Sequence, residues 1–542
     1  MLEIAIILIS AFVLRLYGIS WDAGHHLHPD ERMLIMVADR INFFKNLNPD
    51  FFNYGSLPVY ILKGLTQISD FIFKSSFNTY DGMLLFGRSL SISFDLLTVI
   101  LIYKISQLLF KNKKLSLIAS FLYGIAFFPI QNSHFFVVDV FLTMLTSLLC
   151  YLLLLFFESR EGKNNLANIL LISMTFAAMM ATKFTAIIFF PIIILTIIFK
   201  EYKNIKKLFL YLFVSSLISG FCYFLFMPYA FIDHLRFTSD LASQLRMNSN
   251  PYIFPYTLQY VATIPYLYYL KNIFIWGLGP FISIIFLIGL IGLMRLIGLI
   301  GHISKERLFK YKSHLLFLGF YLLYFLIVGR SAVKFMRYML PLYPFFTILA
   351  AYGIYRIKKS RFKILSYFII LLAVFWTFMF VNIYSQVHTR NAATNWIIKN
   401  IPSQKTLAIE HWDDKLPLVD SEKYQFQELT LYDQPDDNNK WEILNDKIKK
   451  SDYIIIASNR LYIPLSKLAD CNKFESCYPM TAQYYQKLFS GKLGFKKVVE
   501  FTNYPAIQLG HWRFEIKDDN ADESFTVYDH PKIMIFKKTN VQ

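Results

Sequence analysis

Runs of apolar residues, separated by short polar and basic stretches, dominate the first 385 residues of this 542-residue chain. Runs of about 18 apolar residues or more are typical of helices that cross a membrane. The pattern predicts eleven spans, at 2–19, 89–110, 115–132, 138–157, 166–182, 185–199, 208–228, 272–298, 314–329, 338–355 and 363–385. We therefore expect a polytopic α-helical membrane protein.

The composition agrees with this class. Hydrophobic residues make up 55% of the chain and charged residues only 17%, whereas a soluble domain of this length needs more polar surface. The formal charge of +18 could indicate nucleic acid. However, the basic residues lie in loops between apolar segments, where the positive-inside rule and anionic headgroups explain them. We expect no nucleic-acid partner.

The basic residues also predict an orientation. They gather near residues 111–114, 160–163, 200–207, 305–312 and 356–363. If these loops face the cytoplasm, the N-terminus is cytoplasmic, and an odd number of spans places residues 386–542 outside. The first segment carries Glu3 and no small-residue cleavage site, so we expect a retained anchor. The predicted location is the plasma membrane.

Two long outer loops and a tail complete the predicted domains. Residues 1–385 form the membrane module, with outer loops 20–88 and 229–271. In the first loop, Asp30–Phe44 has helical apolar periodicity, which predicts a helix with its apolar face toward acyl chains. The second loop is rich in Tyr and Pro and could be a mobile cover over a site. Residues 386–542 alternate helical stretches (391–400) with strand-like runs (453–457, 532–536), which predicts an extracytoplasmic α/β domain.

Two of the four cysteines lie in this tail. Cys471 and Cys477 are separated by five residues, and a disulfide is plausible there if the tail lies outside the cytoplasm. Cys150 and Cys222 lie inside apolar runs, where buried thiols act as small hydrophobes.

The first candidate chemistry is the stretch His25–Arg32, just beyond the first apolar segment. Its Pro29-Asp30-Glu31 order is also how a helix begins, because proline suits the first position and carboxylates complement the dipole. Nevertheless, a paired carboxylate at a membrane boundary is costly unless it has a function. Asp30 and Glu31 are therefore candidate catalytic residues.

Further charges are expected on the same outer face. A single basic residue there could be a snorkelling side chain, but their convergence with the acids favours a site. The candidates are Arg88, Asp139, Lys183, Lys334 and Arg337. His28 and His134 are supporting candidates. Together with His25 and His26 they could bind a divalent metal near Asp30, although hydrated interfacial histidines are the favoured interpretation.

These residues resemble the GT-C membrane glycosyltransferases, in particular the protein O-mannosyltransferase and aminoarabinose transferase group. The resemblance rests on the Asp30-Glu31 pair, Arg88 heading the second span, Asp139 in the second outer loop, and the stretch Lys334-x-x-Arg337-Tyr-x-Leu-Pro341. The tail motifs Ala393-x-x-Trp396-Ile and Glu523–Pro531 are similar to C-terminal regions of bacterial and archaeal members.

The resemblance implies a hexosyl or pentosyl transferase that uses a polyprenyl-phosphate sugar donor and a protein, lipid or glycan acceptor. It implies an inverting reaction with Asp30 as the base and Glu31 in support. The basic residues would bind the donor phosphate: Arg88, Lys183, Lys334 and Arg337. No cofactor is required by this chemistry, and Mg or Mn could assist. Where aminoarabinose transferases carry a Glu-Lys-Pro-Pro-like stretch, this chain has Asn53–Pro58, which counts against a lipid A role.

Two other hypotheses remain. A flippase of lipid-linked sugars would make no bond, but transporters usually place charges near the midplane, and here they are expected at one face. Alternatively, the tail could be the functional module and the spans its anchor, although eleven spans are many for an anchor.

Overall fold

The computed structural model describes residues 2–159, 165–300, 305–358 and 363–539, and the chain divides into two compact units. The first unit holds Met1–Ile19, Pro29–Leu245 and Ile264–Phe378, and the second holds Ser20–His28, Arg246–Thr263 and Met379–Gln542. The division between Phe378 and Met379 lies close to the predicted boundary at 385, and two short outer segments join the second unit. Four basic residues expected on the inner side lie outside the described residues: Arg160, Lys163, Lys359 and Arg361.

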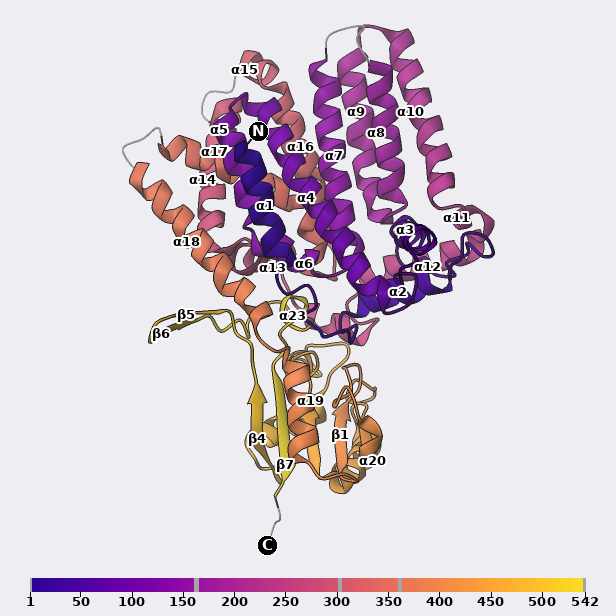
Figure 1. Cartoon of the computed structure of the whole chain (residues 1–542), viewed down its shortest axis with the longest axis vertical. Coiled ribbons are helices and arrows are strands. Elements are labelled where there is room, and N and C mark those ends of the chain that lie inside the picture. Colours follow the sequence, from indigo (N-terminus) through magenta and orange to yellow (C-terminus); the bar gives the residue numbers. More distant parts are fainter. Residues whose placement is uncertain (1, 160–164, 301–304, 359–362, 540–542) are drawn as a thin grey trace. The chain divides into compact units, whose positions relative to one another are not determined.

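The first unit is helical (Figure 1), and each of the eleven predicted segments coincides with a helix or a run of consecutive helices. The helices are α1 (Leu2–Leu16), α4 (Gly82–Phe110), α5 (Lys113–Gly124), α6 (Phe127–Ser133), α7 (Val138–Glu158), α8 (Asn165–Met180), η1 (Phe184–Phe189) with α9 (Phe190–Glu201), α10 (Ile205–Phe226), α13 (Leu267–Asn272), η3 (Ile273–Gly277) with α14 (Gly279–Ile297), α15 (Lys305–Lys310), α16 (Lys312–Val328), η4 (Met336–Leu342) with α17 (Tyr343–Lys358), and α18 (Lys363–Val381).

Among the described residues, seven helices are long and apolar enough to cross a membrane, or eight if the pair α5–α6, bent by 56°, counts as one span. The apolar helices α8 and α16 are shorter, and α1 has 15 residues. The prediction of a multi-span helical membrane protein is confirmed.

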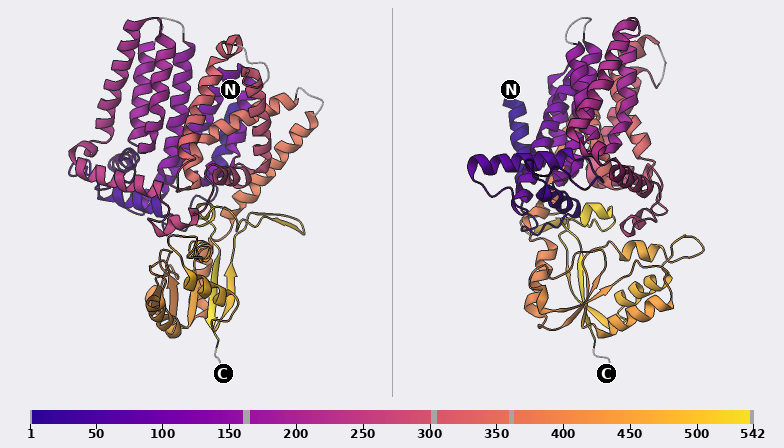
Figure 2. Two further views of the ribbon diagram at one scale, coloured as in Figure 1. Left: turned by 180° about the vertical axis from the view of Figure 1, so that it is seen from behind. Right: turned by 90° about the vertical axis from the view of Figure 1, so that its right-hand side faces the viewer.

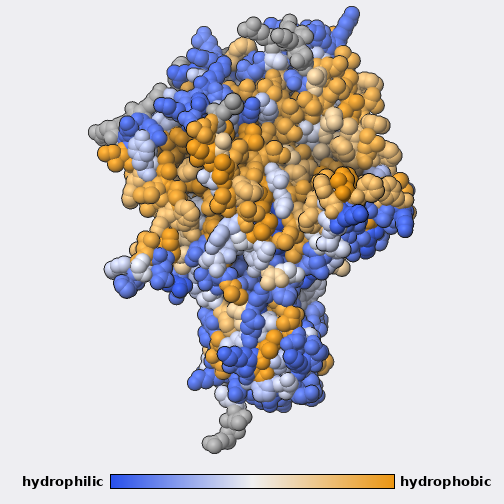
Figure 3. Space-filling model, viewed as in Figure 1, coloured by the Kyte–Doolittle hydropathy of each residue, from blue (hydrophilic) through white to orange (hydrophobic). Residues whose placement is uncertain are grey.

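Burial separates an inner from an outer set of helices. Every residue of α17 from Tyr343 to Ile354 is buried, and α7 is buried over most of its length. By contrast, α10 buries only Tyr211, Ser215 and Cys222 and exposes a row of Phe and Leu side chains. Figure 3 shows hydrophobic residues over much of the visible face of the helical part, with hydrophilic residues at its two ends. These outer faces suit contact with acyl chains, where the backbone is satisfied within each helix.

Helices α14 and α17 pack with their backbones almost touching. A Cβ atom on Gly289 would lie 1.8 Å from the carbonyl oxygen of Leu349, and one on Gly353 would lie 2.4 Å from that of Ile285. Small residues permit this approach, which is a common basis of helix association in membranes. The segment directly before α17, η4, packs against α7.

A buried ion pair joins α1 to the helices beside it. Arg15 Nε contacts Asp95 Oδ2 of α4 at 2.5 Å, and the Tyr123 hydroxyl of α5 donates to Asp95 Oδ1 at 2.5 Å. Arg15 also donates to the carbonyl oxygen of Gly124, at the break between α5 and α6. The sequence does not predict this cluster, because both charges lie inside apolar runs.

The first outer loop forms α2 (Pro29–Arg40) and α3 (Leu57–Phe73), and Figure 2 shows the indigo helices of this region running across the ends of the long helices. The helix predicted over Asp30–Phe44 is confirmed but ends at Arg40, and the predicted contact of its apolar side with lipid is wrong for Leu34, Val37 and Ile41. Leu34, Val37 and Ile41 are buried against side chains of α3 and α4. Periodicity identified the apolar face correctly, and protein rather than lipid covers it. Most of α3 beyond Thr66 instead exposes apolar side chains: Ile68, Phe71, Ile72 and Phe73.

The second outer loop forms α11 (Tyr229–Ile232), α12 (His234–Ser249) and η2 (Pro255–Tyr260). Most of its Tyr- and Pro-rich part, expected as a mobile cover, lies within Arg246–Thr263 and belongs to the second unit, whereas Pro265 and Tyr266 belong to the first. Leu258 and Val261 belong to that unit's hydrophobic core, and Lys467 Nζ donates to the carbonyl oxygen of Val261 at 2.5 Å. These contacts hold residues 258–261 in place.

The second unit contains a mixed five-stranded sheet of order β2-β1-β3-β7-β4. Strand β1 pairs in parallel with β2 and β3, and β7 is antiparallel to β3 and β4. The strands are β1 (Thr406–Glu410), β2 (Gln425–Leu429), β3 (Tyr453–Ile456), β4 (Phe495–Phe501) and β7 (Ile533–Lys538), with a separate hairpin of β5 (Ala506–Leu509) and β6 (Trp512–Glu515).

The helices of this unit are α19 (Thr389–Asn400), α20 (Asn438–Lys450), α21 (Tyr462–Lys467), α22 (Pro479–Phe489) and α23 (Glu523–Thr526), with short 3-10 turns η5 (Asn382–Ser385) and η6 (Ser421–Lys423). The predicted α/β domain is confirmed, as are the helix at 391–400 and the strands at 453–457 and 532–536. Cys471 and Cys477 form the expected disulfide, and Cys150 and Cys222 are buried free thiols.

We expect Gly289→Ala to destabilise the first unit by about 1–3 kcal/mol, because the added methyl group overpacks the contact of α14 with α17. The matched control is Gly220→Ala on α10, where a Cβ would meet nothing within 4 Å and where alanine favours the helix by up to about 1 kcal/mol. Thermal unfolding of the two purified variants in detergent measures the difference. Equal unfolding temperatures would show that the α14–α17 contact tolerates a wider spacing.

Candidate active site

Four charged side chains form a continuous chain of ion pairs in the first unit. Asp30 Oδ2 lies 2.8 Å from Arg337 Nη2. Arg337 Nε lies 3.7 Å from Asp139 Oδ2, and the other oxygen of Asp139 accepts a hydrogen bond from Lys183 Nζ at 2.7 Å. The structure therefore brings together four of the residues that the sequence singled out, from segments up to 307 positions apart (337 minus 30).

Local structure places each of these groups. Asp30 lies in the first turn of α2, behind Pro29, and Asp139 lies in the first turn of α7. Both carboxylates are thus at helix N-termini, where the helix dipole stabilises negative charge. Lys183 precedes η1, and Arg337 is the second residue of η4. Each cation therefore lies at the start of a 3-10 turn that leads into an apolar helix.

The four charged side chains of this cluster differ in their exposure to solvent. The side chains of Asp139 and Arg337 are 2% and 9% exposed, that of Lys183 is 12% exposed, and that of Asp30 is 23% exposed. Asp30 is consequently the carboxylate most accessible to another molecule. Two carboxylates balance two cations, so an added anion would have to compete with Asp30 and Asp139 for Arg337 and Lys183.

Two tyrosines flank the cation of Lys183. Its Nζ lies 4.2 Å from the centre of the Tyr338 ring and 5.9 Å from that of Tyr54, within the range of cation–π attraction. Burial lowers the pKa of Lys183, and the neighbouring Asp139 opposes that shift. Burial, followed by the charge of Asp30, raises the pKa of the Tyr54 hydroxyl well above its ordinary value, so Tyr54 is a neutral hydrogen-bonding group.

A tight contact fixes Tyr54 beside Lys183. The next residue, Gly55, donates its backbone N–H to the carbonyl oxygen of Thr182 at 3.0 Å, and Leu57 donates to that of Ala181 at 3.0 Å. A Cβ on Gly55 would lie 1.9 Å from the Ala181 oxygen, so only glycine fits. Tyr54, from the stretch Asn53–Pro58 that the sequence showed only as a departure from aminoarabinose transferases, therefore lies beside this cluster.

Glu31 and Arg88 form a second pair. Arg88 Nε and Nη2 contact the two oxygens of Glu31 at 3.0 and 2.7 Å, and Arg88 Nη1 donates to the carbonyl oxygen of Ile19 at 2.8 Å. Glu31 also accepts the backbone N–H of Phe136 at 2.8 Å. Both side chains are fully buried. The predicted roles of this pair in catalysis and phosphate binding remain predictions, but these contacts give it a role in fixing α2 against α4 and against the segments that contain Ile19 and Phe136.

The remaining candidates lie elsewhere. His134 is buried, with its two ring nitrogens 2.8 and 2.9 Å from the carbonyl oxygens of Ile130 and Tyr17. Those contacts suit a link between α6 and α1 better than a metal ligand. Lys334 is buried and donates to the carbonyl oxygen of Ala332 at 2.8 Å. His28 belongs to the second unit, where its ring lies 4.0 Å from that of Tyr528.

The described residues provide no ready set of ligands for the suggested metal site. Across the described ranges, no group of three or more His, Cys, Asp and Glu side chains is arranged to hold a metal ion. The carboxylates of Asp30 and Asp139 already face Arg337 and Lys183. Among the described residues, Arg337 and Lys183 are thus the cations that face these two acids.

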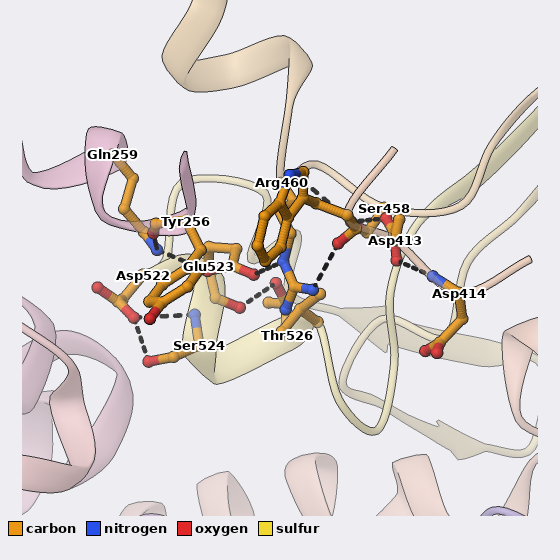
Figure 4. Close-up of polar contacts among 12 residues, drawn as sticks. Tyr256, Gln259, Asp413, Asp414, Ser458, Arg460, Asp522, Glu523, Ser524 and Thr526 are labelled. Carbon is orange, nitrogen blue, oxygen red and sulfur yellow. Dashed lines mark hydrogen bonds and ion pairs between the residues drawn. The ribbon is translucent and has the colours of Figure 1, made fainter. Parts of the chain in front are cut away.

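The second unit has its own buried polar network, around the tail motif Glu523–Pro531 (Figure 4). Glu523 accepts from Arg460 Nε at 2.8 Å and from Gln259 Nε2 at 2.6 Å. Asp413, beyond the end of β1, accepts from Ser458 and from Arg390 Nη2, the latter at 2.9 Å. These groups neutralise one another, so the network connects β1, β3, α19 and the tail motif.

The end of the motif adds a buried charged histidine. His530 Nε2 lies 2.9 Å from Asp518 Oδ2, and its Nδ1 lies 2.5 Å from Asp529 Oδ1. Burial alone would lower the pKa of His530, but the charges of Asp529 and Asp518 outweigh it and raise the pKa to about 10. Tyr384 donates to the other oxygen of Asp529 at 2.7 Å.

Comparison with known proteins agrees with the resemblance inferred from the motifs. The family described as dolichyl-phosphate-mannose-protein mannosyltransferase matches residues 82–228, which cover α4 to α10 and include Arg88, Asp139 and Lys183. No curated protein matches the chain in sequence.

Solved structures match over most of the chain. The oligosaccharyltransferase of Archaeoglobus fulgidus in its apo form is 13% identical, with a TM-score of 0.54, over 89% of this chain and 72% of that one. The same organism's AglB, in complex with an inhibitory peptide and a dolichol-phosphate, is 12% identical with a TM-score of 0.53, over 95% and 74%. ArnT from Cupriavidus metallidurans bound to undecaprenyl phosphate is 12% identical with a TM-score of 0.49, over 86% and 94%. The predicted resemblance to GT-C membrane glycosyltransferases is confirmed at the level of the fold.

We expect Gly55→Ala to separate the loop at Tyr54 from the end of α8 and to cost about 1–3 kcal/mol through overpacking. Trypsin should then cut after Lys183, which is protected in the unchanged protein. The control is Gly64→Ala on α3, where a Cβ would meet only the Phe43 ring at 3.4 Å and protection should persist. Protection of Lys183 in both variants would contradict the role assigned to Gly55.

The second unit should lose stability as the pH rises from about 6.5 to 10. The folded-state pKa of His530, about 10, exceeds the ordinary value of 6.5, so its stabilising effect is complete below the unfolded value and disappears as His530 loses its proton. His530→Gln should lower stability at pH 7 by about 3–5 kcal/mol, because Asp518 and Asp529 lose a buried partner, and should flatten the pH dependence. Hydrogen exchange of β7 in the full chain, corrected for intrinsic rates, measures both effects. An equal pH slope in both proteins would assign the loss to another group.

Proposed function

We propose that this protein is an integral-membrane glycosyltransferase that moves a sugar from a polyprenyl-phosphate carrier to an acceptor hydroxyl. The observation that carries the proposal is the pairing of Asp30, the most exposed acid of the cluster, with Arg337, which in turn faces Asp139 and Lys183. One accessible carboxylate beside two cations suits a reaction that removes a proton and expels a phosphate.

In the proposed reaction, Asp30 takes the proton of the acceptor hydroxyl as its oxygen attacks the anomeric carbon. The bond between that carbon and the phosphate oxygen breaks on the opposite face, which inverts the configuration. Arg337 and Lys183 stabilise the charge that the leaving polyprenyl phosphate gains. Asp139 contacts both cations and holds them in place until the donor arrives.

The second charged pair positions this machinery. Glu31 follows Asp30 directly in α2. It accepts two hydrogen bonds from Arg88 and one from the backbone N–H of Phe136. Arg88 donates a further hydrogen bond to the carbonyl oxygen of Ile19. We infer that Glu31 and Arg88 set the position of Asp30. Lys334, three residues before Arg337, remains a candidate for the donor phosphate.

The comparisons support this function over a flippase. The matching family is described by a dolichyl-phosphate-mannose donor and a protein acceptor, and a structure of the same fold contains a dolichol-phosphate and an inhibitory peptide. A polyprenyl-phosphate sugar is accordingly the proposed donor, with a hexosyl or pentosyl group. The acceptor is a hydroxyl of a protein, lipid or glycan, and mass spectrometry of glycans from cells with and without the chain would identify it.

The proposed setting is the plasma membrane, with the N-terminus in the cytoplasm and residues 386–542 outside, as the distribution of basic residues suggests. No step of the proposed mechanism uses a metal ion. Adding a chelator, and then Mg or Mn, to a transfer assay would show whether a divalent ion assists.

Asp30→Asn should lower sugar transfer by about 10²–10⁴-fold, the usual contribution of a general base, while the protein still inserts and purifies. The assay measures polyprenyl phosphate released from a polyprenyl-phosphate sugar. Asp39→Asn, an exposed acid on the same helix, is the matched control and should transfer normally. Undiminished transfer by Asp30→Asn would remove the base assignment, and a wild-type protein that moves the donor across vesicles without releasing polyprenyl phosphate would favour the flippase.

A further inference from the structure

Tyr54 is a polar residue beside the charged cluster of the first unit that the proposed reaction does not use. Its ring centre lies 5.9 Å from Lys183 Nζ, and the residue is half-buried. The charges of Asp30 and Arg337 both act on its hydroxyl. Within the described residues, this hydroxyl makes no hydrogen bond. Tyr54 therefore offers a free hydrogen-bond donor beside the accessible acid and the two cations of the cluster.

The loop that carries Tyr54 is fixed from two sides. On one side, Gly55 packs against the residues that directly follow α8. On the other side, the backbone N–H of Phe52 donates to Asp240 Oδ2 of α12 at 3.0 Å, and the rings of Phe52 and Phe237 lie 5.8 Å apart. A polar group that is held in this way loses little conformational freedom when it binds a ligand.

The balance of charge in the cluster favours an uncharged donor. Both cations already pair with carboxylates, so an arriving phosphate must compete with Asp30 for Arg337 and with Asp139 for Lys183. The Tyr54 hydroxyl has no such competitor. Burial and the charge of Asp30 raise the pKa of this hydroxyl well above its ordinary value. The hydroxyl therefore keeps its proton and can donate it in a hydrogen bond to an anion.

We propose that the Tyr54 hydroxyl donates a hydrogen bond to a phosphate oxygen of the polyprenyl-phosphate donor. The hydrogen bond persists as the sugar leaves and the phosphate gains negative charge, and Tyr54 itself gives up no proton. A hydrogen bond to the attacking oxygen of the acceptor would instead make that oxygen a weaker nucleophile. The proposal rests on the proposed function and adds a third donor, beside Arg337 and Lys183, to its phosphate site.

Tyr54→Phe tests the hydroxyl alone, because the aromatic ring beside Lys183 remains. The matched control is Tyr60→Phe on α3, whose hydroxyl donates to the carbonyl oxygen of Leu47 at 2.9 Å. Wild type and both variants are purified as full-length proteins in detergent. Protection of Lys183 from trypsin shows that the loop of Tyr54 remains in place. Binding is then measured with a polyprenyl phosphate and with the polyprenol of the same chain length.

We expect Tyr54→Phe to weaken the binding of polyprenyl phosphate by about 10- to 100-fold, the usual effect of one hydrogen bond to a charged group. Binding of the polyprenol should not change, because it carries no phosphate. Tyr60→Phe should bind both lipids as wild type does.

Equal binding of polyprenyl phosphate by Tyr54→Phe and by wild type would overturn the proposal and leave the proposed reaction intact. An equal loss of binding for both lipids would assign Tyr54 to the lipid chain or to packing of the loop and would also overturn it, as would the same loss in Tyr60→Phe. A wild-type protein that binds polyprenyl phosphate no better than the polyprenol would contradict the proposed function itself, and the phosphate site with it.

Discussion

The structure depends on one electrostatic constraint: a charge in apolar surroundings needs an opposite charge within hydrogen-bonding distance. Buried pairs satisfy it at three places in the first unit. Arg15 with Asp95 joins α1 to α4, Glu31 with Arg88 joins α2 to α4, and Asp139 with Lys183 joins α7 to the turn before η1. In a membrane, where the hydrophobic effect does little to hold helices together, such pairs specify which helices are neighbours.

The same constraint gives Asp30 its distinct character. Glu31 and Asp139 are fully or almost fully buried and have short contacts to cations, whereas Asp30 keeps nearly a quarter of its side chain exposed. One residue of α2 is thus committed to the structure and its neighbour remains accessible. A donor phosphate would compete with Asp30 for Arg337, so donor binding would free the carboxylate that the proposed mechanism needs as a base. In the proposed mechanism, the residue with a structural role and the residue with the catalytic role are adjacent in α2.

The sequence predicted most helices and strands but only some of the contacts between charged residues. Apolar runs located all eleven helical segments because hydrophobic length is a local property, and the motifs located Asp30, Asp139, Lys183 and Arg337 because charge at a membrane boundary is conspicuous. Partner choice depends on contacts between distant segments, so the sequence did not predict that Arg88 contacts Glu31. The apolar face of α2 was predicted to contact lipid, but it packs on protein. Periodicity shows that a face is buried and does not show whether lipid or protein covers it. Tyr54 and Gly55 were overlooked because their role arises from the fit against Ala181 and Thr182.

The second unit shows how the constraint extends beyond the membrane. Its buried motif, Glu523–Pro531, neutralises Arg460 and holds charged His530 between two aspartates. The stretch His25–Arg32, continuous in sequence, is divided: His28 packs on Tyr528 within this unit, while Asp30 and Glu31 belong to the first. Buried charges with opposite partners therefore stabilise this unit. The unit also includes residues 20–28 and 246–263, which come from loops of the membrane module. Residues 20–28, which directly precede α2 in the chain, thus belong to the same unit as this motif.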